Sequence, residues 1–317
     1  MRKYLLSTSA LAGAALLSSA AVADVSISGS FEFDYAARDS NIAANDGNLM
    51  GHDQEVHVNF TNKTDSGLTI TANNQFKTSS GGKDDVSVSI SGGFGKLVLG
   101  GNDGASNNYS MPADAIIQEE SMDAGNSASI NMKDTEIAGS DANKISYHLP
   151  AMGGLTAGAS FTNASAAGDS DTTEFGFKYA MDAGGAAITI GGGTSTLENS
   201  TQDVDAQNLG LTVVSGDISV GLSQGSYEGS AIDETSTSAA VSFKVSDVMT
   251  VGAFTTEVED DSTSEELQVS GVELAYTIAP GLSAVINVED YDYKVGTSSG
   301  NTADSGTTSR LAIKASF

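Results

Sequence analysis

Apolar and polar side chains alternate along nearly the whole of this chain, and residues 309–317 show the pattern most clearly. Leu311, Ile313 and Phe317 fall on one face of the predicted strand, whereas Arg310 falls on the other. A soluble domain rarely ends in the middle of a strand on an exposed phenylalanine. In a closed barrel within a bilayer, by contrast, the apolar face contacts lipid and the final aromatic lies at the membrane–water interface.

The same period-two pattern recurs in earlier segments, and with the terminal strand we count sixteen predicted strands. Phe31, Phe33 and Tyr35, for example, alternate with Glu32 and Asp34. The polar positions are mostly Ser, Thr, Gly and Asn, which a water-filled interior tolerates. A soluble β-sandwich or a solenoid is the alternative, but its polar face would carry mixed Lys and Glu.

The connections between these strands fall into two length classes that mostly alternate. The tight ones are rich in Gly, Asp and Pro, the residues that hairpin turns require, and lie at residues 64–67, 91–93, 150–154, 182–185, 214–217 and 279–281. The long ones are polar and acidic and lie at residues 39–52, 102–142, 163–171, 196–206, 228–235, 259–266 and 295–306. This asymmetry predicts an all-β, transmembrane antiparallel β-barrel of 16 strands, with tight turns in the periplasm and loops outside.

The N-terminus has the parts of a secretory signal. Arg2 and Lys3 supply positive charge, a short apolar core follows, and small residues just before Asp24 form a cleavage site. A transmembrane anchor is the other interpretation, but the apolar run is too short for one. We therefore predict a signal peptide at residues 1–23 and a single barrel domain at residues 24–317.

Composition excludes several classes of protein. The chain has no Cys, so disulfides cannot hold it together, and no later segment approaches 18 consecutive apolar residues, which excludes a helical membrane protein. A formal net charge of −27 argues against nucleic acid or an anionic membrane surface as an electrostatic partner. The chain lacks the HExxH, GxSxG, P-loop and CxxC motifs, so we expect neither an enzyme nor a cofactor.

Three stretches carry a resemblance to a known family. They are Thr64-Asp65-Ser66-Gly67-Leu68, the segment VSISGGFGKLVLG at residues 88–100, and Gly104-Ala105-Ser106. Together they resemble the general diffusion porins of alphaproteobacteria, the Rhodobacter-type trimeric porins. The resemblance implies a homotrimeric porin in the outer membrane of a Gram-negative cell, which passes small hydrophilic solutes by diffusion. It also implies that the long third loop folds into the barrel lumen and forms the constriction.

The residues single out the same loop, 102–142, because it is by far the longest stretch without clean alternation. A short apolar piece around Ile116 and Ile117 is suited to pack on the barrel wall. By analogy with the family, we expect the acidic side of the constriction to consist of Asp114, Glu119, Glu120 and Asp123. The alternative is a loop that extends outward with its carboxylates in solvent.

In the family a basic cluster faces this loop across the pore. Strand parity offers Arg38, His57 and Lys77 as candidates for a basic pore wall. For each of them alone, a solvated position in the lumen or at its rim is the favoured alternative, because parity does not fix height in the barrel. The chain departs from the family pattern here, because Asp53 and Glu55 occupy the places of arginines early in the second strand. We therefore expect a weak basic wall and a cation-selective pore.

The predicted function is passive diffusion of ions and small hydrophilic solutes, cations above all, through an outer-membrane channel. The expected partners are outer-membrane lipid, two further copies of the chain, and the outer-membrane assembly machinery, which would recognise Leu311, Ile313 and Phe317 as a C-terminal assembly signal. The alternative function is a secreted acidic calcium-binding adhesin or β-roll surface protein, which would require tandem nonapeptides, and only isolated Gly-Gly fragments occur here. A barrel enzyme is a third hypothesis, but no Ser/His/Asp set lies on neighbouring strands.

Overall fold

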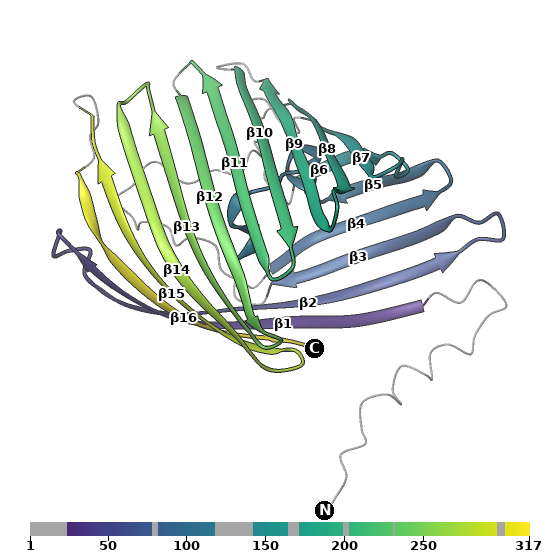
Figure 1. Ribbon diagram of the computed structural model, residues 1–317. Coiled ribbons are helices and arrows are strands. Elements are labelled where there is room, and N and C mark those ends of the chain that lie inside the picture. Colours follow the sequence, from purple (N-terminus) through teal and green to yellow (C-terminus); the bar gives the residue numbers. More distant parts are fainter. Residues whose placement is uncertain are drawn as a thin grey trace, which may run out of the picture.

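The computed structural model describes residues 24–77, 82–117, 142–163, 171–198, 203–230, 232–296 and 302–317. Within them, sixteen strands form one closed antiparallel barrel, in which strands adjacent in sequence pair and β1 pairs with β16 (Figure 1). The strands are β1 (Asp24–Ser40), β2 (Gly47–Lys63), β3 (Thr69–Lys77), β4 (Gly82–Gly92), β5 (Gly95–Gly101), β6 (Asn143–His148), β7 (Leu155–Thr162), β8 (Asp171–Asp182), β9 (Ala186–Glu198), β10 (Asp203–Ser215), β11 (Ile218–Gly229), β12 (Ile232–Ser246), β13 (Met249–Asp260), β14 (Glu265–Ala279), β15 (Leu282–Lys294) and β16 (Asp304–Ser316). The predicted fold class is confirmed.

The connection between β5 and β6 carries two short helical turns, α1 (Ala105–Asn108) and η1 (Ala113–Ile116). Both pack against strands of the barrel, α1 against β7–β9 and η1 against β10–β12. The long third loop therefore enters the lumen over the part that the structure describes. Among the described residues, no helix has the length and apolar character needed to span a membrane.

The last strand closes the barrel. Phe33 and Tyr35 of β1 lie opposite Ile313 and Leu311 of β16, so the apolar faces of the two strands coincide. At the end of the seam, the Phe317 amide donates to the Gly29 carbonyl at 2.9 Å, and the Gly29 amide donates to the Phe317 carbonyl at 3.2 Å. Because both edges are paired, this sheet leaves no open edge, as a membrane-spanning barrel requires.

A band of apolar side chains covers the outside of the barrel. On β14 its members are Val272, Leu274, Tyr276 and Ile278, and each of them is exposed. Their neighbours toward the inside, such as Glu273 and Ala275, are buried. Exposed apolar surface of this extent is unfavourable in water but suits hydrocarbon. In this band the apolar side chains therefore face outward, as a membrane barrel requires.

On the long strands β13, β14 and β15, the apolar side chains change from the outer to the inner face toward the end of the barrel that carries the long connections. We call this end the loop end. There the outward side chains of β14 are Gln268 and Ser270, whereas the inward ones, Leu267 and Val269, are buried. Neighbouring β13 and β15 show the same reversal, with Val258 and Tyr293 buried inside. The wall therefore rises beyond the apolar band, and its upper part has polar groups outside and an apolar cluster inside.

Most of the long connections are shorter than the sequence predicted, because the strands continue past the apolar band with polar side chains on their outer face. Residues 39–52 were expected to form a loop, but β1 continues to Ser40 and β2 begins at Gly47. Residues 228–235 were expected to form another, but β11 ends at Gly229 and β12 begins at Ile232. Asp39, Glu228 and Asp233 in these stretches point outward from regular strands, whereas Glu234 is buried on the inner side of β12. High polarity alone therefore did not mark a loop. The connection at 102–142 has the predicted bounds.

Candidate functional site

One side of the candidate site is the segment 102–117, which lies along the inner wall. Ala105 and Ser106 of α1 are fully buried, and Ala113 and Ile117 belong to an apolar cluster with Phe254 of β13. Ile116 packs against the same cluster. The expectation that Ile116 and Ile117 pack on the wall is therefore met.

A buried carboxylate fixes the start of this segment. Glu174 of β8 is fully buried, and its Oε1 accepts a hydrogen bond from Ser106 Oγ at 2.7 Å. Its other oxygen accepts from Ser160 Oγ of β7, and that hydroxyl accepts from the Ala105 amide at 2.8 Å. A carboxylate that accepts from two hydroxyls is better satisfied than a lone buried charge would be. The result is a firm attachment of α1 to β7 and β8.

Two further hydrogen bonds hold the rest of the segment. The Tyr109 hydroxyl and His148 Nδ1 of β6 lie 2.9 Å apart, with the two rings tilted by 49°. The Ala113 amide donates to Ser223 Oγ of β11 at 2.9 Å. Attachments on β6, β7, β8 and β11 therefore stabilise residues 105–113 along the wall.

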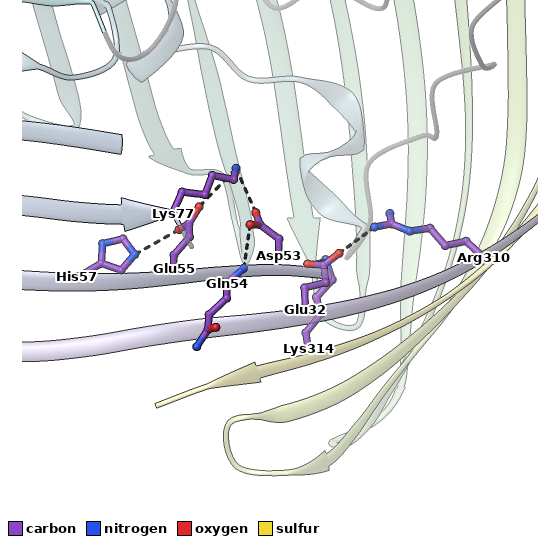
Figure 2. Close-up of polar contacts among 8 residues, drawn as sticks. All are labelled: Glu32, Asp53, Gln54, Glu55, His57, Lys77, Arg310 and Lys314. Atoms are coloured by element: carbon purple, nitrogen blue, oxygen red, sulfur yellow. Dashed lines mark hydrogen bonds and ion pairs between the residues drawn. The ribbon is translucent and has the colours of Figure 1, made fainter. Parts of the chain in front are cut away.

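The opposite wall carries an ion-pair network on the inner faces of β16, β1, β2 and β3 (Figure 2). Arg310 Nη2 lies 2.6 Å from Asp34 Oδ1 and 2.8 Å from Glu32 Oε1. Lys314 Nζ lies 3.5 Å from the other oxygen of Glu32. Closure of the barrel through the β1–β16 seam brings these four residues together.

The same network continues onto β2 and β3. Lys77 Nζ lies 3.1 Å from Asp53 Oδ2 and 3.9 Å from Glu55 Oε1. His57 Nε2 lies 3.3 Å from Glu55 Oε2. Two of the three predicted basic wall residues, His57 and Lys77, therefore face carboxylates of β2 (Figure 2).

The remaining predicted residues are placed as follows. Arg38 lies on the inner face of β1, with its guanidinium carbon 5.7 Å from the centroid of the Tyr291 ring. Asp114 lies in the first turn of η1 and is partly buried. The other three acidic candidates, Glu119, Glu120 and Asp123, fall outside the described residues. Leu311 and Ile313 face outward on β16, and Phe317 is exposed at the seam.

Sequence reasoning missed four members of the network as pore-wall residues: Glu32, Asp34, Arg310 and Lys314. Strand parity placed all four on polar faces, but parity does not say which strands are neighbours. Only pairing of the first strand with the last puts Arg310 beside Glu32 and Asp34. Among the described residues, no group of three or more His, Cys, Asp or Glu side chains is arranged to hold a metal ion.

A closed barrel with an apolar outer band, a polar lumen and an inserted loop defines a channel-forming protein of the outer-membrane type. Sequence comparison agrees with this class, since the profile described as "Gram-negative porin" matches residues 7–296. The chain therefore belongs to the Gram-negative porin family, whose members are non-enzymatic outer-membrane channels for passive diffusion. No curated protein sequence matches it.

Solved structures share the fold at low sequence identity. An anion-selective porin from Comamonas acidovorans is 18% identical, with a TM-score of 0.67 over 93% of this chain and 100% of that one. The trimer form of OmpT, an outer membrane protein of Vibrio cholerae, is 14% identical, with a TM-score of 0.68 over 93% and 99%. A mutant of the Rh. blastica porin is 15% identical, with a TM-score of 0.64 over 93% and 100%.

Proposed function

We propose that this porin is a cation-selective channel. The observation that carries the proposal is the composition of the wall opposite the loop, where four carboxylates (Glu32, Asp34, Asp53 and Glu55) meet three cations (Arg310, Lys314 and Lys77). Within this set of ion-paired groups, carboxylates outnumber the Lys and Arg side chains by one. Asp114 and, beyond the described residues, Glu119, Glu120 and Asp123 would add negative charge from the loop side.

Carboxylates on a low-dielectric wall concentrate cations and repel anions. The fold does not by itself require cation preference, because the similar Comamonas acidovorans porin is described as anion-selective. The sign of selectivity depends on which charged side chains face the lumen. In this chain those side chains and the net charge of −27 both favour cations.

The first prediction concerns reversal potentials in a salt gradient across a planar bilayer. We expect the sign for cation preference, and a potential that shrinks with rising salt because the Debye length falls from about 10 Å at 0.1 M to about 3 Å at 1 M. The double variant Asp53→Asn, Glu55→Gln leaves Lys77 and His57 without these carboxylates, so its potential should shift toward anions.

The matched control is Glu257→Gln, Glu259→Gln, because both side chains face outward from β13 while the loss of charge is the same. It should leave the reversal potential near that of the parent. Anion preference in the parent channel, or equal shifts in the two double variants, would contradict the proposal.

We also propose that the channel is a homotrimer, in which the outer face of β2 and β3 contacts a neighbouring copy of the chain. There the apolar band contains polar side chains: His52 lies in one row with Phe33 of β1 and Ile313 of β16, and Asn74 lies in one row with Val58. Polar groups at this depth are unfavourable against lipid tails and suit a protein contact. The similar Vibrio cholerae protein is described in a trimer form.

The route to the membrane is part of the same proposal. Residues 1–23 would direct export and be cleaved before Asp24, and the assembly machinery would recognise Leu311, Ile313 and Phe317 on the terminal strand. The support for the second step is their place at the seam, since this strand must be inserted for the barrel to close.

A further inference from the structure

A diagonal row of glycines crosses the inner wall beneath residues 104–117. Each of these glycines faces the lumen by strand register, and each lies against a residue of that segment. The row consists of Gly158 on β7, Gly176 on β8, Gly191 and Gly193 on β9, Gly210 on β10, Gly221 on β11 and Gly252 on β13. We call it the glycine track. On β12, between its last two members, the small and buried Ala240 packs in one apolar cluster with Ala113 and Ile117.

The track has no room for side chains. A Cβ atom on Gly191 would lie 2.7 Å from the Tyr109 carbonyl oxygen, and on Gly210 or Gly221 it would overlap a carbonyl oxygen of the segment. Carbon atoms pack at about 3.5–4.0 Å, so each added methyl would displace the segment toward the pore axis by roughly 1 Å.

Backbone conformation does not account for these glycines. None of the seven has a positive φ, whereas the turn glycines at positions 67, 154, 184, 216 and 281 all do. Glycine inside a strand weakens the strand, and it is usually found where another backbone approaches closely. At five of the seven the approaching backbone includes that of the loop segment, and at Gly158 and Gly252 the segment approaches with the side chains of Tyr109 and Ile117. The segment therefore lies recessed in the wall.

The attachments of the segment prevent it from avoiding an added side chain by sliding. Hydrogen bonds to Ser160, Glu174 and Ser223 hold it along the wall, and Ile117 is buried at its end. Displacement away from the wall, toward the pore axis, is the direction that these attachments leave.

We propose that the glycine track sets the free cross-section of the pore. It recesses residues 104–117 into the wall of β7–β13, so that the size of the track residues decides how far the segment projects into the lumen. The glycines are thus positioning residues for diffusion through the channel. The inference rests on the channel function but not on its charge preference.

The test is single-channel conductance of Gly210→Ala and Gly221→Ala in planar bilayers, together with the entry rates of sugars of graded size into vesicles. Both variants should lose conductance by roughly tens of per cent, because conduction depends on pore radius. Both should also exclude smaller sugars than the parent excludes. A purely structural role would lower the yield of folded channels without changing the conductance of those that form.

The matched control is Gly51→Ala, which adds a methyl to the inner face of β2 where nothing lies within 4 Å. Its conductance should equal that of the parent. Conductance of Gly210→Ala equal to the control, or above it, would overturn the proposal.

A second pair of variants serves if the first fails to fold. A Cβ on Gly252 would meet chiefly the Ile117 side chain, with Cγ2 at 2.7 Å. Gly252→Ala should therefore lower conductance in the parent but much less in an Ile117→Ala background. An equal loss in both backgrounds would refute the proposal. Reversal potentials of the same channels report the charge preference separately, so failure of one proposal leaves the other distinguishable.

Discussion

Arg310 joins the last strand of the barrel to the first on the inner side of the wall. Its guanidinium contacts Asp34 and Glu32, and its side chain is only 17% exposed. Because a planar guanidinium holds two carboxylates better than an ammonium does, Lys is a poor replacement at this position.

We predict that Arg310→Met strengthens cation selectivity and lowers the free energy of unfolding by about 2 kcal/mol, since two partly buried carboxylates lose their cation. Arg310→Lys should have smaller effects of the same sign. Reversal potentials and denaturant unfolding in lipid vesicles measure the two quantities. A shift toward anions in Arg310→Met would show that this network does not control the ion preference.

Within a single strand, the face that carries apolar side chains changes with height along the barrel. Along β14 the outward residue Leu274 belongs to the apolar band, whereas the outward residue Gln268 lies beyond it, on the same face and six positions away. Period two therefore predicts the faces of each strand correctly, but which face is apolar depends on height along the barrel.

We predict that Leu274→Arg lowers the free energy of unfolding in vesicles by about 2–4 kcal/mol, and that Gln268→Arg changes it by no more than about 1 kcal/mol. The reason is that the first places a charge against hydrocarbon and the second places it in water. Denaturant titration of the folded barrels compares the pair directly. Equal costs at the two positions would mean that the bilayer boundary does not lie between them.

The whole molecule is expected to exist as three exported copies. We predict that the protein part of channels purified in detergent has three times the mass of one chain by light scattering. Mass spectrometry of the intact chain should give the mass of residues 24–317. Heating in detergent should convert the oligomer to a monomer of higher electrophoretic mobility. A monomeric active channel would contradict the proposed contact around His52 and Asn74, and a chain that retains residues 1–23 would contradict the cleavage.

The sequence by itself determined the number of strands, the tight turns and the place of the long third loop, because period-two alternation and turn chemistry are local properties of the chain. It also indicated that Asp53 and Glu55 weaken the basic wall. Tertiary structure alone decided that Arg310 faces Glu32 and Asp34, that β11 continues through its polar end to Gly229, and that seven glycines form one track. Each of these depends on which strands lie side by side and at what height, and closure of the barrel fixes both at long range.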